Sequence, residues 1–332
     1  MSAPLRVGVV GTGRIGKLHA KLLVHELPGA ALAMVYDTAP AAAAGLGAPV
    51  ASSALELVRS ADVDAVAICS TTDTHVDLVI EAAEAGKPIF CEKPISLDLA
   101  EVDRALAAVE RAGVLFMVGF NRRFDPGHRS VRDAVAAGEI GEVRLVRITS
   151  RDPEPPPLDY IRHSGGLFLD MTIHDFDMAR FVTGSEVVEV YARGAVRVDP
   201  AIGDAGDIDT AAVILTHADG TLTLIDNSRQ AVYGFDQRVE AFGSNGMAAS
   251  QNVPLHGGLL RTAGGGTEPR LPTFFLDRYI SSYLAEWEAF LAAVENGERS
   301  PVPPEDGRAP LAVGLAALRS LREARPVAVA SP

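Results

Sequence analysis

Three side chains in residues 166–181, GLFLDMTIHDFDMARF, could carry out acid–base chemistry together. Read as a helix at about 100° per residue, the segment brings Asp170, His174 and Asp177 within about 60° of one another on a mostly apolar surface. An imidazole can accept a hydroxyl proton near neutral pH, so His174 is the candidate base, and Asp170 could orient its ring. Asp177 could accept hydrogen bonds from further hydroxyl groups. The alternative is a core histidine satisfied by a neighbouring carboxylate.

A glycine pattern near the start of the chain, GTGRIG, fits a phosphate-binding turn. It follows a predicted strand and precedes a predicted helix, which is the context that the motif needs. The first glycine permits a tight turn, the second lets a pyrophosphate approach the backbone, and the third lets helix and strand pack closely. We therefore predict a dinucleotide site at this turn, formed by Gly11, Gly13, Arg14, Ile15 and Gly16. A plain glycine-rich turn is the alternative.

Asp37 ends the second predicted strand, about 20 residues beyond the turn, where a carboxylate can accept hydrogen bonds from an adenosine ribose. A carboxylate repels a 2′-phosphate, and the following TAPAAAA has no basic residue, so NAD is favoured over NADP. The third predicted strand ends in STTDTH, at the sheet edge where doubly wound folds bind ligands. Ser70, Thr71 and His75 are candidate cofactor contacts there. Thr74 is more simply explained as a helix cap.

The segment CEKP ends the fourth predicted strand and carries Glu92 and Lys93 to the same sheet edge, where a nicotinamide would bind. Pro94 has no amide to continue a ladder and can take the cis form, which would turn Lys93 sharply. A lysine beside an oxidised nicotinamide would have a lowered pKa and could donate a hydrogen bond to a substrate hydroxyl. A surface lysine at a strand end is the alternative.

The elements that position these residues follow two patterns. In the first third of the chain, apolar runs alternate with helical patterns, which is typical of a doubly wound parallel sheet. The runs lie at 5–11, 31–37, 65–70, 88–93 and 115–120, and the helices at 13–26, 54–59, 75–85 and 99–112. Later segments alternate apolar with polar residues, which favours an antiparallel sheet with one covered face. These segments lie at 143–149, 187–198, 210–216, 221–228 and 237–243, with loops at 152–157 and 263–269 and helices at 280–296 and 307–324.

Composition and charge exclude several classes of protein. With 332 residues, 48% of them hydrophobic, the chain exceeds the usual size of a single core, so we expect two domains. A formal net charge of −13 and a pI of about 5.1 disfavour nucleic acid or an anionic membrane as partner. Cys69 and Cys91 lie in predicted buried strands, and no signal-peptide or membrane-spanning pattern occurs. We therefore expect a cytoplasmic protein.

Taken together, GTGRIG, CEKP and GGLFLDMTIHDFDMARF resemble the motifs of the Gfo/Idh/MocA family of NAD(P)-dependent sugar and polyol dehydrogenases. Two further segments, GFNRRFDP and SRDPEPPP, are most similar to inositol dehydrogenases within it. The resemblance covers essentially the whole chain. It implies an α/β protein with an NAD-binding Rossmann domain over 1–121. It also implies an α+β domain over 122–332 with a large, open, mostly antiparallel sheet, which binds substrate and builds dimers or tetramers; we expect a homotetramer.

The resemblance matches Lys93, Asp170 and His174 to the catalytic lysine, aspartate and histidine of the family. The implied reaction is NAD-dependent oxidation of a secondary hydroxyl of a cyclic polyol, and we expect myo-inositol to give 2-keto-myo-inositol (scyllo-inosose). Other substrates remain open: scyllo- or chiro-inositol, or an aldopyranose such as glucose. An NAD-dependent glycosidase and a non-catalytic NAD-binding regulator are further alternatives.

The resemblance also implies that Asn121, Arg123 and Tyr233 contact the substrate. An exposed interdomain ion pair is the alternative for Arg123. The predicted site uses NAD and no metal ion.

Overall fold

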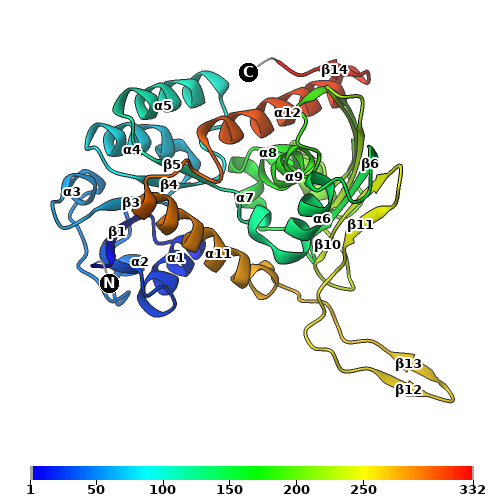
Figure 1. The fold of residues 1–332 in the computed structure, drawn as a ribbon, viewed down its shortest axis with the longest axis horizontal. Helices are drawn as coiled ribbons and strands as arrows, with labels where there is room; N and C mark the ends of the chain where they lie inside the picture. Colours follow the sequence, from blue (N-terminus) through cyan, green and yellow to red (C-terminus); the bar gives the residue numbers. More distant parts are fainter. Residues whose placement is uncertain (1–2, 331–332) are drawn as a thin grey trace. The chain divides into compact units, whose positions relative to one another are not determined.

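The computed structural model describes residues 3–330, and the chain divides into two compact units, which we describe separately (Figure 1). The units comprise Met1–Asn121 with Tyr283–Ala309, and Arg122–Ser282 with Pro310–Pro332. Within residues 3–330, no helix combines the length and the apolar character needed to cross a membrane.

The predicted domains, 1–121 and 122–332, differ from these units in one segment. Tyr283–Ala309 belongs to the first unit, although it follows most of the second in the sequence. The physical reason is aromatic packing, because the ring of Trp287 stacks on that of Phe90 with 4.8 Å between centroids.

The first unit is built on a parallel sheet of five strands in the order β2-β1-β3-β4-β5, so the five predicted strands and their parallel pairing are confirmed. The strands are β1 (Leu5–Val10), β2 (Ala30–Tyr36), β3 (Ala65–Ile68), β4 (Ile89–Glu92) and β5 (Phe116–Gly119). All residues of β3, β4 and β5 are buried, as expected for strands covered on both faces, whereas β2 at the sheet edge is mostly half-buried. The strand order reverses between β1 and β3, and in doubly wound sheets ligands bind at such a point.

The helices of the first unit follow the strands. They are α1 (Arg14–His25), α2 (Pro40–Ala43), α3 (Ala54–Arg59), α4 (Thr72–Glu84) and α5 (Leu99–Ala112), and α11 (Phe275–Asn296) contributes its part from residue 283. Helix α5 has clear end signals, because the Asp98 carboxylate accepts the amide of Ala100 and Gly113 ends it at φ +64°. Helix α4 begins earlier than predicted. Thr74 is not its cap, because its hydroxyl donates to the Thr71 carbonyl.

The second unit contains a seven-stranded sheet in the order β11-β10-β6-β9-β8-β7-β14. The strands are β6 (Val143–Arg151), β7 (Val187–Ala195), β8 (Thr210–His217), β9 (Leu222–Ser228), β10 (Asp236–Gly243), β11 (Met247–Ser250) and β14 (Val327–Ala328). Every neighbouring pair is antiparallel except β6 with β9, so the predicted mostly antiparallel sheet is confirmed.

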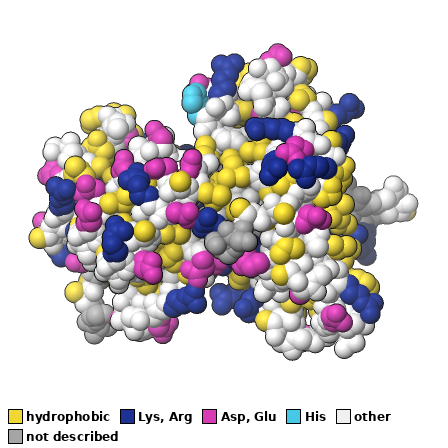
Figure 2. Space-filling view, turned by 90° about the horizontal axis from the view of Figure 1, so that it is seen from above, with side chains coloured by type: hydrophobic (Ala, Val, Ile, Leu, Met, Phe, Trp, Pro, Cys, Tyr) yellow, Lys and Arg dark blue, Asp and Glu magenta, His cyan; other side chains and the backbone are white. Residues whose placement is uncertain are grey.

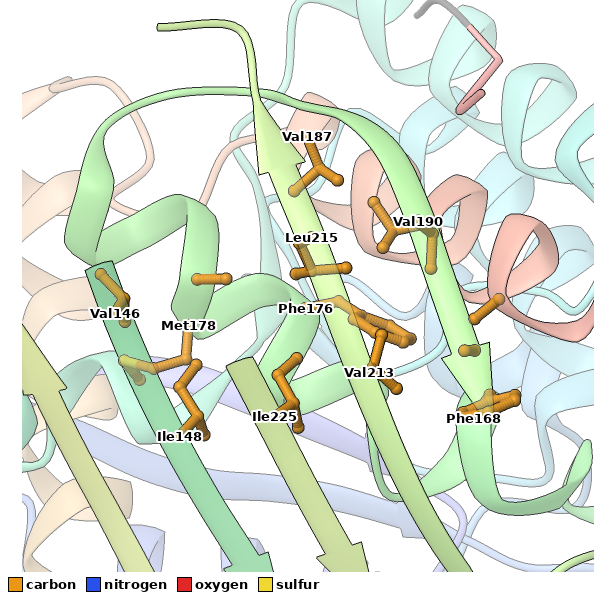
Figure 3. Packing of buried hydrophobic residues seen from close by; sticks show 14 of the residues in the cluster. Val146, Ile148, Phe168, Phe176, Met178, Val187, Val190, Val213, Leu215 and Ile225 are labelled. Carbon is orange, nitrogen blue, oxygen red and sulfur yellow. The ribbon is translucent and has the colours of Figure 1, made fainter. Parts of the chain in front are cut away.

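One face of this sheet is covered by helices, and there the core of the second unit lies. The helices of the unit include α6 (Pro126–Ala136), α7 (Leu158–His163), α8 (Gly166–Asp170), α9 (Ile173–Thr183), α10 (Pro200–Asp204) and the end of α12 (Pro304–Glu323). Phe168, Phe176 and Met178 of the helices belong to one buried cluster with Ile148 and Ile225 of the sheet (Figure 3). The opposite face carries large apolar side chains that are more than a third exposed in the chain alone, including Ile214, Leu222 and Phe242.

Two smaller features complete the second unit. A 3₁₀ turn, Asn121–Phe124, begins where β5 ends. Strands β12 (Leu260–Thr262) and β13 (Gly265–Thr267) form a separate hairpin that extends from the sheet (Figure 1), so the predicted loop at 263–269 includes a short strand. Basic and acidic side chains are interspersed over the face of the molecule in Figure 2, with apolar atoms between them.

Candidate active site

The glycine turn has the shape of a phosphate cradle. Gly11 has φ +86°, and a Cβ atom on it would lie 2.4 Å from the Ser70 backbone, so a side chain there is excluded. A Cβ on Gly16 would lie 1.9 Å from the Gly11 carbonyl oxygen. At Gly13, by contrast, no described atom lies within 4 Å of the Cβ position. The outer glycines are therefore fixed by packing, and the middle one faces open space beside the start of α1, as a dinucleotide requires.

Asp37 is held in place directly after β2. Its carboxylate accepts hydrogen bonds from the amide and hydroxyl of Thr12, at 2.7 and 3.0 Å, and from the Ala39 amide at 2.9 Å. Partial burial raises the pKa of Asp37, but these hydrogen bonds outweigh it and leave the pKa below its ordinary value. The side chain is therefore a fixed anion beside the glycine turn, suited to ribose hydroxyls and unsuited to a 2′-phosphate.

His75 connects the loop that follows β3 to the loop that follows β4. The buried imidazole contacts the Pro94 carbonyl through Nδ1 at 2.9 Å and the Ser70 carbonyl through Nε2 at 3.0 Å. Burial lowers the pKa of His75. The polar atoms of His75 thus link the loop after β3 to the loop after β4. The Lys93–Pro94 peptide bond is cis, as the sequence predicted.

In the second unit, the single helix predicted over 166–181 is wrong. The chain forms α8 and α9 with a break between them, so Asp170 ends one helix and His174 lies in the first turn of the next. The break occurs at Thr172, whose hydroxyl donates to the Asn227 side chain at 2.8 Å and contacts the Leu167 carbonyl at 3.2 Å. Side-chain bonds of this kind compete with a regular helix. His174 and Asp177 remain on α9.

Asp170 is held in place by residues from other segments of the chain. The Tyr160 hydroxyl donates to Asp170 Oδ1 at 2.8 Å, and the Arg229 guanidinium lies 3.6 Å from Oδ2. The Arg229 side chain is 1% exposed and also donates to Asp207 at 3.4 Å. Asp207 in turn accepts the Leu167 amide at the start of α8. The clamp holds Asp170 as an oriented carboxylate, and no local sequence pattern marks Tyr160, Asp207 or Arg229.

Asp177 and Arg123 form a bidentate ion pair, with Nε and Nη2 of the arginine 2.8 and 2.5 Å from the two carboxylate oxygens. Both side chains are buried, and the guanidinium lies 5.2 Å from the centroid of the Phe181 ring. Arg123 is thus an ion-pair partner, but within the second unit and not on an exposed surface. Arg123 and Asp177, both predicted to contact substrate, thus form an ion pair with each other.

A second buried network beside this pair was not predicted. The Arg122 guanidinium donates to Asp175 at 2.8 Å, and the Asn227 amide donates to the other carboxylate oxygen at 2.8 Å. Complete burial raises the pKa of Asp175 to about 6, although Arg122 and Asn227 act in the opposite direction. Burial also raises the pKa of Asp152 to about 6. The repeated aspartates at 170, 175 and 177, with the arginine pair at 122–123, are the only sequence signal of this network.

The remaining predicted residues are placed differently. Asn121 is buried at the start of the 3₁₀ turn. The Tyr233 hydroxyl donates to Asp236 at 2.6 Å and accepts from Arg151 at 2.9 Å, and its side chain is half exposed. These partners place Tyr233 beside β6 and β10, not in the clamp around Asp170. Among residues 3–330, no group of three or more His, Cys, Asp or Glu side chains is arranged to hold a metal ion.

Comparisons with known proteins identify the family of the chain. A model described as an oxidoreductase family with an NAD-binding Rossmann fold matches residues 5–120, and a GFO/IDH/MocA C-terminal domain model matches residues 128–249. The chain belongs to the Gfo/Idh/MocA family of oxidoreductases. The family expected from the sequence is thus confirmed.

Relatives within the Gfo/Idh/MocA family match along the whole chain. Myo-inositol 2-dehydrogenase of Thermotoga maritima is 49% identical, over 97% of this chain and 98% of its own. Inositol 2-dehydrogenase of Rhizobium meliloti is 50% identical, over 98% and 99%. Among solved structures, scyllo-inositol dehydrogenase of Lactobacillus casei with bound NAD(H) and scyllo-inositol has a TM-score of 0.93 and 32% identity, covering 99% of this chain and 100% of its own.

Proposed function

We propose that this Gfo/Idh/MocA protein oxidises myo-inositol to 2-keto-myo-inositol (scyllo-inosose) with NAD. The observation that carries the proposal is near-full-length identity of 49–50% with two inositol 2-dehydrogenases, in a chain that keeps Lys93, Asp170 and His174. A scyllo-inositol dehydrogenase of Bacillus subtilis is 36% identical over 98% of this chain, so scyllo-inositol is the second candidate substrate.

The first unit supplies the dinucleotide site. NAD, when bound, accepts the hydride that leaves the substrate carbon. The amides of Gly13, Arg14 and Ile15 at the start of α1 would hold its pyrophosphate, and Asp37 its ribose. Ser70, Thr71 and Glu92 follow the neighbouring strands at the same sheet edge and complete the candidate cofactor contacts.

The second unit supplies the base. His174 takes the proton of the substrate hydroxyl, and Asp170, fixed by Tyr160 and Arg229, orients the imidazole and stabilises its charged form. Lys93 of the first unit donates a hydrogen bond to the substrate oxygen and stabilises the negative charge that develops on it. Because proton removal and hydride loss occur at one CH–OH group, all three side chains serve one carbon.

The other candidate residues divide into two groups. We assign Arg123 and Asp177 to the support of α9, because each neutralises the other in a buried pair. Asn121 and Tyr233 remain proposed substrate contacts, and polyol hydroxyls would suit both side chains as hydrogen-bond partners.

We also propose that the protein works as a homotetramer in the cytoplasm. The exposed apolar face of the seven-stranded sheet, with Ile214, Leu222 and Phe242, supports assembly through that face. The buried free thiols Cys69 and Cys91 suit a reducing compartment.

One assay tests the proposed reaction. The purified protein is mixed with NAD and, separately, with myo-, scyllo- and chiro-inositol, glucose and an aryl glycoside, and NADH is followed by absorbance. We expect the highest kcat/KM with myo-inositol. A higher value with another polyol would overturn the substrate. Glycoside cleavage without net NADH would indicate the glycosidase, and NAD binding with no turnover would indicate the regulator.

A further inference from the structure

A chain of hydrogen bonds within the first unit leads from Trp287 on α11 to the backbone of Lys93. The Trp287 indole N–H donates to Nδ1 of His19 on α1 at 2.9 Å. Nε2 of His19 lies 2.8 Å from Oε1 of Glu92 at the end of β4. The other carboxylate oxygen of Glu92 accepts the Lys93 amide at 3.3 Å. Trp287 thus contacts His19, and His19 contacts Glu92, the residue before Lys93.

The chemistry of the indole fixes the proton on His19. An indole nitrogen is only a donor, so Nδ1 of His19 must be the acceptor and cannot carry a proton. The single ring proton therefore sits on Nε2 and points at the Glu92 carboxylate. His19 is a neutral imidazole in this arrangement, although it lies beside a carboxylate that would favour the charged form. Trp287 thus decides both the tautomer and the charge of His19.

The surrounding side chains and backbone restrict the positions of His19 and Glu92. The His19 side chain is fully buried, with the rings of Phe90 and Tyr283 at 5.2 and 5.6 Å between centroids. Gly119 on β5 closes the other side, because a Cβ atom there would lie 3.2 Å from the Glu92 carboxylate. Glu92 is therefore confined between His19 and the neighbouring strand.

Titratable side chains from the neighbouring strands and helices surround Glu92. Burial, with the charge of Glu92, raises the pKa of the Cys69 and Cys91 thiols and of the Glu286 carboxyl on α11 well above their usual ranges. Burial lowers the pKa of His75. Burial thus disfavours the charged form of each of these four groups.

We propose that His19 and Trp287 are positioning residues for Lys93: they fix the Glu92 carboxylate, which holds the Lys93 backbone and so aims its side chain. This role rests on the proposed function, in which Lys93 holds the substrate oxygen. Lys93 itself touches substrate, whereas His19 and Trp287 act only through Glu92. Loss of the network should lower kcat more than it lowers the affinity for NAD, because Glu92 is one of several candidate cofactor contacts and the substitutions leave the glycine turn and Asp37 in place.

Two pairs of variants separate this role from simple packing. His19→Gln keeps an acceptor for the indole and a donor for Glu92, whereas His19→Leu keeps volume and loses both. We expect kcat to stay within about threefold of wild type for His19→Gln and to fall at least tenfold for His19→Leu. Trp287→Phe, which keeps an aromatic ring and loses only the donor, should lower kcat by about three- to tenfold. NADH titration, with the dissociation constant within about threefold of wild type, establishes that each variant is folded.

A second readout needs no turnover. Trp287 is the only tryptophan of the chain, so its indole N–H gives a single resonance in a ¹H–¹⁵N spectrum. We expect this resonance to show the shift of a hydrogen-bonded indole in the wild type, because the N–H donates to Nδ1 of His19. It should move in His19→Leu and keep a hydrogen-bonded shift in His19→Gln.

The outcomes distinguish the two proposals. An indole resonance without a hydrogen-bonded shift in the wild type would overturn the fixed tautomer. A kcat of His19→Leu equal to wild type, with inositol turnover intact, would overturn the positioning role and leave the proposed function standing. A hydrogen-bonded indole resonance in a protein that turns over no polyol would overturn the proposed function and leave the hydrogen-bond chain standing.

Discussion

At the scale of single residues, the proposed base gives the most direct test. His174→Ala removes the imidazole on α9 that we propose as the base, while the glycine turn and Asp37 lie in the other unit. We expect turnover to fall by about two to four orders of magnitude. The dissociation constant for NADH, measured by fluorescence, should change by less than about threefold. Wild-type turnover in this variant would remove His174 from the role of base.

Cofactor choice is a second property of one residue. Asp37→Ala removes the fixed anion beside the glycine turn, together with hydrogen bonds from Thr12 and Ala39. We expect NAD to bind about tenfold more weakly and the preference over NADP to shrink, because both a ribose acceptor and a repulsion of the 2′-phosphate are lost. Kinetics with both cofactors measure this. An unchanged ratio of kcat/KM values would contradict the assignment, and Asp62→Ala, a distant exposed carboxylate, is the control.

The candidate residues that sequence reasoning found are those with a local signal. Gly11, Gly16 and Asp37 belong to a spaced motif whose physical demands can be read along the chain. The clamp residues Tyr160 and Arg229 carry no such signal, because their contacts to Asp170 depend on how separate segments pack. Contacts between separate segments cannot be predicted from a short stretch of sequence.

At the scale of elements, a buried cluster joins α6, β11 and the start of α11 and makes stability depend on pH. Asp125, the N-cap of α6, pairs with Arg278, and His128 lies beside Ser250 at 3.1 Å and Tyr279 at 3.4 Å. Burial lowers the pKa of His128 to about 4, although Asp125 acts in the opposite direction. The folded protein therefore binds fewer protons than the unfolded chain between this value and the ordinary pKa of histidine.

The sign of the effect follows. The stability that neutral His128 contributes is fully present above about pH 6.5 and is lost as the pH falls toward about 4, by roughly 3 kcal/mol in all. We expect His128→Gln to flatten this part of the curve of unfolding free energy against pH, measured with urea. Because Asp152 and Asp175 have raised pKa values and contribute the opposite slope, the difference between wild type and variant is the quantity to compare. Equal slopes in the two proteins would contradict the prediction.

The elements also show where periodicity stops being informative. The parallel strands were predictable because each is a continuous apolar run between helices, and the second sheet because its strands alternate. The helix at 166–181 was not, since its apolar and polar spacing is consistent with one helix of 16 residues. The Thr172 hydroxyl, which bonds to Asn227 on β9, breaks it instead. Tertiary contacts thus override local periodicity at the site itself.

At the scale of the whole molecule, the order of the segments in the sequence differs from their grouping into units. The change of sequence pattern after residue 120 predicts a domain boundary there, and the first continuous segment of the first unit ends at Asn121. Nothing in the sequence marks the return of Tyr283–Ala309 to that unit. Its cause is a cluster in which Trp287 and Phe290 cover Phe90, and such aromatic partners can be paired only in three dimensions.

Assembly is the last property of the whole molecule, and the exposed sheet face makes it testable. Ile214 on β8 is 41% exposed in the chain alone, on the face that the helices leave uncovered. If that face joins subunits, Ile214→Glu buries a charge at an apolar interface, which costs several kcal/mol per interface. We expect light scattering after size exclusion to show a smaller assembly for this variant than for the wild-type protein, which we propose to be a tetramer, with unchanged far-UV circular dichroism. Leu55→Glu, at an equally exposed position in the first unit (42%), is the matched control and should keep the wild-type mass. An unchanged mass for Ile214→Glu would move the interface to another surface.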